Sequence, residues 1–313
     1  MNVVAILNPN AGKGIAAALP SALRVQLGAA LADIRCPADA EDATTQVRDA
    51  VRGGADVILA AGGDGTLNAV INGIRGYRAA LALLPAGSAN DFAAQNGCSA
   101  SLQALCRAIL RGARRRVDLI DVNGWRYATD GGIGLCASIA RTALRMRSGG
   151  SAATKRGTLG SSLYPLATVR TLAEQSRFGQ RMHVEAAGWR GEVSSSLLTI
   201  SNQRMLGGHF PIAPEAQNDD GLFDVCLVDG RDGRCGLLRL VTEVLRGQHT
   251  TQPDVRCWQD EALRIETDMP VPFLGDGELA EATDRFDVRI LPSALRLVIP
   301  GAARVAPYHR RLS

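Results

Sequence analysis

Lysine is nearly absent from this chain, although basic residues as a group are common. Among 35 basic residues, Lys13 and Lys155 are the lysines and all others are arginines. In such an arginine-rich background, a lysine that persists is a candidate for a role that needs a compact ammonium group. Chance placement is the simpler alternative, so the surrounding residues must decide between the two.

Several segments that define other protein classes are also missing. No apolar run approaches the roughly 20 residues of a transmembrane helix, and residues 1–7 lack the basic region of a signal peptide. The P-loop pattern Gly-x-x-x-x-Gly-Lys-Ser/Thr is absent. The formal net charge of +4 is too small to suggest a nucleic-acid partner. With 313 residues and 46% hydrophobic content, the chain can bury one large core or two medium ones.

Cysteine usage bears on the compartment in which the protein works. The seven cysteines are odd in number and form no Cys-x-x-Cys pair. This pattern predicts free thiols in a reducing, cytoplasmic environment rather than a disulfide framework. It also gives no metal site built from cysteines.

Residues 1–121 alternate between strand and helix patterns, which predicts an α/β domain with a mainly parallel sheet. Strands are expected at 3–7, 33–36, 57–60 and 80–84, and helices at about 15–31, at 42–52, after Thr66 and at about 99–112. Ser99 is the expected N-cap of the last helix. Because ligands of such sheets bind beyond the carboxyl ends of the strands, the loops after these strands should share one edge.

Residues 122–300 change to short strand patterns, which predicts a β-sandwich-like second domain. Its strands are expected at 119–122, 125–129, 181–186, 197–201, 223–228, 255–258, 263–267, 286–290 and 295–299, with helices at 162–175 and 237–245. Asn123-Gly124 is the expected turn of the first hairpin. Residues 145–160 are expected to form a mobile loop, and the tail 301–313 is expected to pack back on the first domain.

The segment Gly62–Thr66 carries the clearest chemical signal, because it joins an apolar strand to an amphipathic helix. Its three glycines let backbone N–H groups approach an anion closely, while Asp64 keeps a carboxylate beside that anion. This combination suits a nucleotide phosphate with its Mg²⁺. An ordinary tight turn would explain the glycines equally well if no other motif accompanied them.

Four further motifs accompany it along the chain. In order, the set is Asn8-Pro9 with Gly12-Lys13; Gly62-Gly63-Asp64-Gly65-Thr66 with Asn68; Leu84-Pro85-Ala86-Gly87-Ser88-Ala89-Asn90-Asp91-Phe92; Asn218-Asp219-Asp220-Gly221-Leu222-Phe223-Asp224; and Gly275-Asp276-Gly277-Glu278. With this set the chain resembles the diacylglycerol-kinase catalytic-domain family, which includes soluble bacterial diacylglycerol kinases, YegS-like lipid kinases, and sphingosine and ceramide kinases. Gly-Gly-Asp-Gly alone also occurs in NAD kinases and bacterial 6-phosphofructokinases.

The resemblance implies an ATP site in the first domain. The matching positions are Asn8, Lys13, Gly63, Asp64, Gly65, Thr66, Asn68 and Ser88. Lys13 would meet phosphate as a point charge, and Ser88 keeps the hydroxyl of the threonine that is usual in the family. A family threonine on the second strand has no counterpart near Cys36-Pro37, and Thr44 or Thr45 is an open substitute.

The resemblance also implies two magnesium positions. Asp64, Asp91 and Asp118 match a network of aspartates, water and Mg²⁺, while Gln217, Asp220 and Leu222 match a structural Mg²⁺ site. Mg²⁺ keeps several waters and takes one or two carboxylates, so no closed cage is needed. Simpler alternatives are a salt bridge of Asp118 with the arginines at 114–116, helix capping by Asp91 and a plain turn at 218–221.

Glu278 is the expected catalytic base, since phosphoryl transfer needs a group that accepts the proton of the acceptor hydroxyl. The glycines on both sides of Asp276 would let this turn present the Glu278 carboxylate. Lys155, Gly160 and Tyr164 match a further family pattern. The basic residues between Arg141 and Arg156 would suit anionic lipid headgroups, although a solvated loop explains them equally well.

The sequence therefore predicts an α/β ATP domain, a β-rich lipid domain and an active site in the cleft between them. The predicted reaction transfers the γ-phosphoryl group of ATP to a lipid hydroxyl, in a cytoplasmic protein that associates transiently with the membrane surface. An NAD kinase-like enzyme and a catalytically silent lipid- or nucleotide-binding regulator are the alternatives. The lipid (diacylglycerol, phosphatidylglycerol or a sphingoid base) and the oligomeric state, including a homodimer, stay open.

Overall fold

The computed structural model describes residues 1–9, 15–87, 90–98, 101–149, 163–174, 179–208, 210–230 and 233–300. Of the residues singled out above, Lys13, Ser88, Lys155 and Gly160 lie outside these ranges, as does the tail 301–313. The chain forms two compact units. One contains Met1–Leu119 with the described residues from Ser293 on, and the other contains Ile120–Pro292.

The N-terminal unit is built on a parallel sheet, as the alternation of strand and helix predicts. Its strand order is β2-β1-β3-β4-β15, and every pair of neighbours in it is parallel. The strands are β1 (Val3–Leu7), β2 (Leu31–Arg35), β3 (Val57–Gly62), β4 (Ala80–Pro85) and the end of β15 (Thr283–Val298). Since β1 and β3 are buried throughout, both faces of the sheet are covered.

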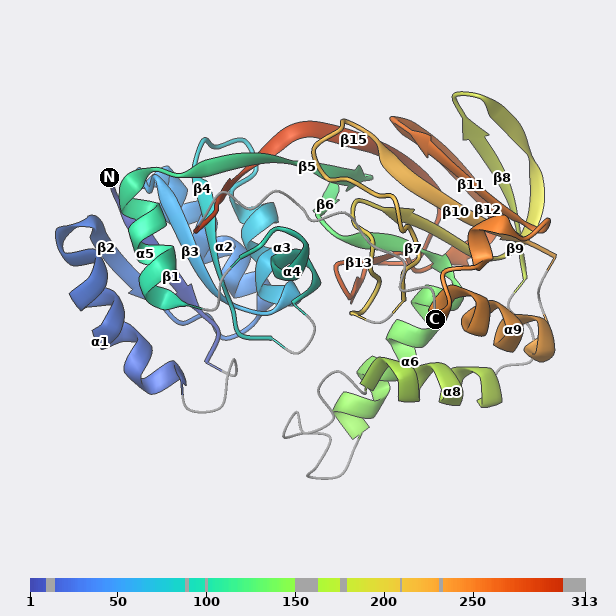
Figure 1. Ribbon diagram of the computed structural model, residues 1–313, viewed down its shortest axis with the longest axis horizontal. Coiled ribbons are helices and arrows are strands. Elements are labelled where there is room, and N and C mark those ends of the chain that lie inside the picture. Colours follow the sequence, from blue (N-terminus) through green and yellow to red (C-terminus); the bar gives the residue numbers. More distant parts are fainter. Residues whose placement is uncertain are drawn as a thin grey trace. The chain divides into compact units, whose positions relative to one another are not determined.

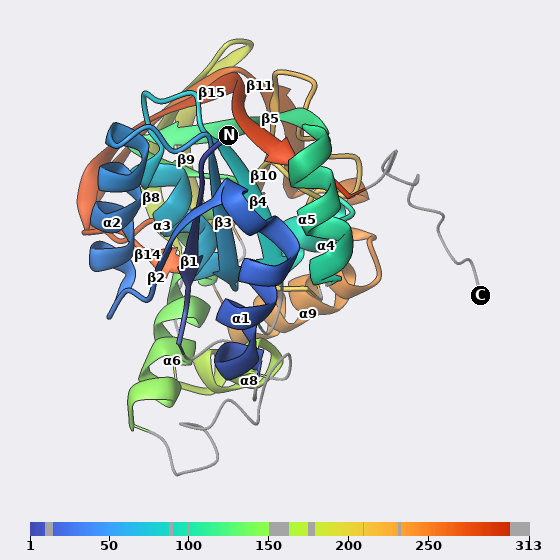
Figure 2. The same cartoon turned by 90° about the vertical axis from the view of Figure 1, so that its left-hand side faces the viewer.

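Helices cover the two faces of this sheet in pairs (Figure 2). They are α1 (Ile15–Leu27), α2 (Ala40–Arg52), α3 (Asp64–Gly73), α4 (Asp91–Gln95) and α5 (Leu102–Arg111), with a 3-10 turn at Gly28–Ala30. In Figure 2, α2 and α3 lie on one side of β1, β3 and β4, and α1 and α5 lie on the other. The α1–α5 face is closed by an apolar cluster to which Leu23 and Leu105 contribute.

Two helices begin at other residues than the sequence predicts, because a different side chain caps each of them. The carboxylate of Asp39 accepts a hydrogen bond from the Asp42 backbone N–H, so α2 begins at Ala40. The hydroxyl of Ser101, rather than that of Ser99, accepts from the Ala104 backbone N–H at 3.3 Å and caps α5.

The C-terminal unit is a β-sandwich (Figure 1), and its strands enclose a large apolar cluster. The strands are β5 (Arg114–Val122), β6 (Trp125–Tyr127), β7 (Asp130–Gly134), β8 (Gln180–Ala186), β9 (Trp189–Ser201), β10 (Phe223–Asp229), β11 (Val255–Asp260), β12 (Ala262–Val271), β13 (Leu274–Gly275), β14 (Glu278–Leu279) and β15. Their order is β14-β13-β7-β9-β8-β12-β15, and β10 joins β9 to β11. The predicted fold class is therefore confirmed for both units.

Three helices of this unit lie together on one side of its strands (Figure 1). They are α6 (Leu135–Gly149), α8 (Leu163–Glu174) and α9 (Arg234–Leu245), and a 3-10 turn follows at His249–Thr251. The prediction missed α6, and the predicted loop at 145–160 is wrong at its start because α6 continues to Gly149. Burial of Leu135, Ala137 and Ala140 against the strands explains this helix.

One long strand replaces the two that were predicted at 286–290 and 295–299. β15 runs through Pro292, and Ser293 adopts a left-handed backbone conformation with φ of 54°. Both β5 and β15 carry residues of the two units.

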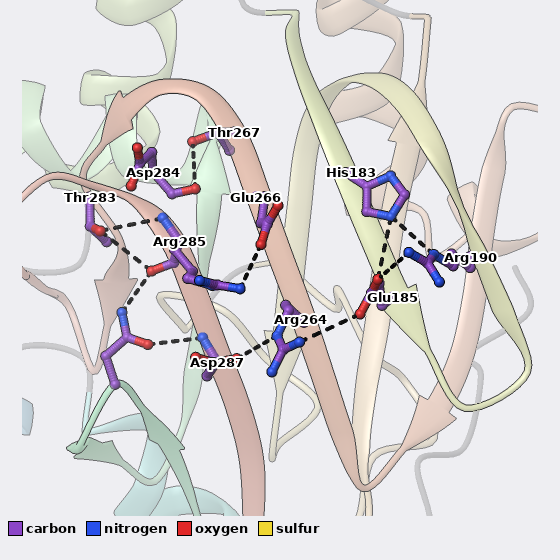
Figure 3. Close-up of polar contacts among 11 residues, drawn as sticks. His183, Glu185, Arg190, Arg264, Glu266, Thr267, Thr283, Asp284, Arg285 and Asp287 are labelled. Atoms are coloured by element: carbon purple, nitrogen blue, oxygen red, sulfur yellow. Dashed lines mark hydrogen bonds and ion pairs between the residues drawn. The ribbon is translucent and has the colours of Figure 1, made fainter.

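The solvent face of β8, β12 and β15 is a ladder of opposite charges (Figure 3). Arg264 Nε lies 2.8 Å from Asp287 Oδ1, and a guanidinium nitrogen of Arg285 lies 2.9 Å from Glu266 Oε1. These side chains alternate along their strands with buried residues such as Ile265. The alternation specifies the register of strand pairing, because a shift by one residue would move the charged side chains into the core. The pairs are exposed, so they contribute specificity of pairing more than free energy.

Candidate functional site

The loop after β3 and the loop after β4 touch through their backbones in the N-terminal unit. A Cβ atom on Gly87 would lie 2.4 Å from the Cα of Gly63, and one on Gly63 would lie 2.9 Å from the Cα of Gly87. The Ala86 backbone N–H donates to the Gly62 carbonyl at 2.9 Å. These two predicted loops therefore do lie together at the carboxyl edge of the parallel sheet.

Asn90 connects these two loops through its side chain and its backbone. Its side-chain oxygen accepts from the Gly87 N–H at 2.9 Å, and its amide nitrogen donates to the Gly87 carbonyl at 2.7 Å. The Asn90 backbone N–H then donates to Asp64 Oδ2 at 3.2 Å. Asn90 has a φ of 55°, a conformation that asparagine tolerates better than most residues. The bridge fixes the Asp64 carboxylate at the first turn of α3.

The first predicted loop meets the same edge through Asn8. Its backbone N–H donates to the Ala61 carbonyl at 3.0 Å, and its side-chain nitrogen donates to the Thr66 hydroxyl at 3.3 Å. Asn68 is buried in α3 and its oxygen accepts from Asn72 at 3.2 Å. Asn8 and Thr66 therefore lie at the same edge of the sheet as the two glycine-containing loops.

Thr44, an open candidate for nucleotide contact, has a local structural role. Its hydroxyl donates to the Ala40 carbonyl at 2.9 Å within α2 and lies 3.3 Å from the Ala69 carbonyl of α3. These contacts give Thr44 a role in the packing of α2 against α3.

The aspartates predicted for the first magnesium position occupy different elements. Asp91 is the first residue of α4, and Asn90 occupies the N-cap position before it. Asp118 is buried on β5, and one of its oxygens accepts from the Ser293 N–H at 2.6 Å. Within the described ranges, no three His, Cys, Asp or Glu side chains are placed to hold a metal ion together. A Mg²⁺ ion bound here would therefore need water or phosphate oxygens as well.

Acidic side chains gather at the predicted structural metal turn in the C-terminal unit. Asp220 Oδ1 accepts from the Leu222 N–H at 3.0 Å, and the Gln259 amide lies 3.4 Å from both Asp220 Oδ2 and Asp224 Oδ2. Burial raises the pKa of Asp224 to about 6, and the charges of Asp220 and Glu215 act in the same direction. A cation at this turn would offset that repulsion.

The predicted catalytic motif forms a tight hairpin between β13 and β14. Asp276 is buried with a φ of 50°, and its carboxylate accepts from the backbone N–H groups of Ala128 and Thr129 and from the Thr129 hydroxyl, at 2.7–3.2 Å. Glu278 is exposed on β14. A Cβ atom on Gly277 would lie 3.2 Å from the Tyr164 hydroxyl, so Tyr164 stands beside this turn.

Several buried polar residues next to this hairpin were not predicted. Gln203 donates to Asp130 Oδ2 at 3.0 Å, and the Asn202 amide donates to the Ala128 carbonyl at 3.1 Å. Asn202 and Gln203 follow β9, and their partners lie just before β7 and at its first residue, next to the backbone that Asp276 binds. A polar run after an apolar strand, Ser201-Asn202-Gln203, is the one sequence signal for them.

None of the helices in the part of the chain that the structure describes combines the length and apolar character needed to span a membrane.

Comparisons with known proteins identify the family of the chain. The diacylglycerol kinase catalytic domain model matches residues 2–122, and the model of the YegS C-terminal NAD kinase beta sandwich-like domain matches residues 144–299. A protein described as a YegS-like lipid kinase in Xanthomonas euvesicatoria is 32% identical over 289 residues, which cover 86% of this chain and 87% of that protein. A diacylglycerol kinase of Staphylococcus saprophyticus is 28% identical over 239 residues, or 76% of this chain and 75% of that one.

The fold has solved counterparts as well. A crystal structure of a diacylglycerol kinase from Bacillus anthracis aligns with a TM-score of 0.73 at 23% identity, covering 95% of this chain and 96% of that one. This likeness shows the fold. The family models and the Xanthomonas relative place the chain in the family of diacylglycerol kinases and YegS-like lipid kinases, so the protein is a kinase of the transferase class.

The contact between Gly63 and Gly87 gives a direct test of the loop arrangement. We expect Gly87→Ala to lower the free energy of unfolding by about 1–3 kcal/mol, because the added methyl group must push the two loops apart. Urea denaturation followed by circular dichroism measures this loss. Gly188→Ala is the control, since a Cβ atom there meets nothing within 4 Å. Equal stability of the two variants would contradict the close packing.

Proposed function

We propose that this protein transfers the γ-phosphoryl group of ATP to a hydroxyl of a lipid at the membrane surface, with Mg²⁺ as the metal. The observation that carries the proposal is the backbone contact of Gly63 with Gly87 beside the fixed carboxylate of Asp64. Because a glycine carries no Cβ atom, phosphate oxygens could approach the backbone at Gly63 and Gly65 closely. The named relatives, a diacylglycerol kinase and a YegS-like lipid kinase, support a lipid as the acceptor.

On the nucleotide side, the backbone around Gly63 and Gly65 and the first turn of α3 would hold the phosphates. The N-terminus of this helix favours negative charge. Asn8, Thr66, Asn68 and Ser88 would complete the contacts, and Lys13 would add a point charge. Asp64, with Asp91 and Asp118 behind water, would hold Mg²⁺, which neutralises charge on the phosphates when it is bound.

On the acceptor side, Glu278 would take the proton of the lipid hydroxyl. The Asp276 carboxylate supports this role because its hydrogen bonds to residues 128 and 129 fix the turn from which Glu278 projects. A glutamate on a fixed hairpin loses little freedom when it meets the hydroxyl, which is what a general base requires.

A comparison of acceptors tests the reaction class. The protein is incubated with radiolabelled ATP and Mg²⁺ in the presence of vesicles of diacylglycerol and phosphatidylglycerol, of vesicles with sphingosine, or of NAD. We expect label in a lipid product identified by mass. Label in NADP would favour the NAD kinase alternative, and no consumption of ATP with any acceptor would favour a silent regulator.

Glu278→Gln tests the catalytic base. We expect the kcat for lipid phosphorylation to fall by about 10²–10⁴-fold, because an amide cannot accept the proton, while ATP affinity by calorimetry stays unchanged. Glu281→Gln, an exposed neighbour on the same connection, is the matched control and should retain full turnover. Turnover of Glu278→Gln at the level of the control would remove Glu278 from this role.

Magnesium dependence tests the second metal position, where the Asp220 carboxylate and the carbonyls of Gln217 and Leu222 would be ligands. Oxygen donors of this kind fit Mg²⁺. We expect saturating Mg²⁺ to raise the melting temperature by about 2–4 °C at pH 7.5, which corresponds to about 1 kcal/mol. Asp220→Asn should lose this increase and Asp219→Asn should keep it; an equal increase in both variants would refute the assignment.

A further inference from the structure

Two cysteines of the C-terminal unit stand directly opposite each other on neighbouring strands. Cys226 of β10 pairs with Cys257 of antiparallel β11 in the register of the sheet. Residues opposed in this way point to the same face, with Cα atoms about 4.5 or 5.5 Å apart according to the type of pair. Disulfides span Cα separations of about 4.4–6.8 Å. The Cα separation of both types of pair therefore falls within the range that a disulfide spans.

The two thiols differ in their access to solvent. Cys226 is 2% exposed and packs in the apolar cluster that includes residues of α9, whereas Cys257 is exposed. Among the described strands, β11 pairs with β10 alone, so Cys257 lies on an edge. A small oxidant in solution can reach Cys257 first. Its buried partner Cys226 lies directly opposite on the neighbouring strand.

The pairing of the two thiols favours attack by Cys257. The neighbouring Cys226 thiol lowers the pKa of Cys257, while partial desolvation and the charge of Asp224 act against that shift. The interaction with Cys257 and burial raise the pKa of Cys226. Because the thiolate is the nucleophile of cysteine chemistry, the exposed member of the pair is also the activated one.

We propose that Cys226 and Cys257 form a redox-active dithiol that hydrogen peroxide converts reversibly into a disulfide. The Cys257 thiolate attacks one peroxide oxygen, an S–O bond forms, the O–O bond breaks, and the departing hydroxide takes a proton to become water. The Cys226 sulfur then attacks the sulfenic sulfur of Cys257, and the second water leaves with the Cys226 proton. Two thiols are oxidised and one peroxide is reduced. The site is independent of the proposed kinase reaction.

Mass spectrometry of the oxidised full-length protein tests the assignment. Reduced protein is treated with hydrogen peroxide, unfolded in N-ethylmaleimide and digested without reductant. We expect the number of alkylated thiols to fall from seven by two, together with one peptide pair that joins Cys226 to Cys257 and separates on addition of dithiothreitol. A bond between any other pair of cysteines, or Cys257 recovered as sulfinic acid with Cys226 still reduced, would overturn the proposal.

Variants separate the attacking thiol from its partner. Cys257→Ser, at an exposed position that should tolerate the change, is expected to leave Cys226 reduced under peroxide. Cys226→Ala should stop the reaction of Cys257 at sulfenic acid, which dimedone traps, and should slow its alkylation by iodoacetamide severalfold. Cys235→Ser, which removes an exposed cysteine of α9, is the matched control and should keep the linkage. Unchanged alkylation of Cys257 in Cys226→Ala would contradict activation by its neighbour.

Discussion

The N-terminal unit depends on one steric constraint, the approach of Gly63 and Gly87 to a distance at which no side chain fits. The two glycines follow adjacent parallel strands, so the sheet itself brings their loops to one edge. Asn90 then closes the gap with hydrogen bonds to Gly87 and to Asp64. Backbone N–H groups, a helix start and a carboxylate meet there because no Cβ atom intervenes. A larger residue at either glycine would move all of them together.

In the C-terminal unit, the corresponding constraint is the buried carboxylate of Asp276. Asp276 lies in the interior, where an unpaired carboxylate would cost several kcal/mol, and its acceptors are filled by donors of residues 128 and 129. The fixed turn leaves Glu278 exposed on the following short strand. Burial of one acidic residue thus determines where its neighbour two positions later can act. Both units place a carboxylate by hydrogen bonds from backbone N–H groups.

Much of this arrangement could be predicted from the sequence where the signal is local. Strand-helix alternation predicts the parallel sheet, and with it the meeting of the loops after β3 and β4 at one edge of that sheet. Asn202, Gln203 and the partners of Asp276 were missed because their contacts join residues far apart in the chain. Helix α6 was missed for a related reason, since its small residues gain stability from packing against strands that follow it in sequence. The caps at Asp39 and Ser101 show that several nearby polar residues compete for one position.

The strand pair β10–β11 carries the thiol pair and adjoins the acidic turn at Asp220. Asp224 opposes Gln259 and Cys226 opposes Cys257, and since strand side chains repeat with a period of two, all four share one face. The negative charge of Asp224 acts against ionisation of Cys257. A cation bound at the Asp220 turn would weaken that effect, because its positive charge offsets the negative potential of the carboxylates at Cys257. The sheet register therefore places the thiol pair on the same face as an acidic residue next to the Asp220 turn.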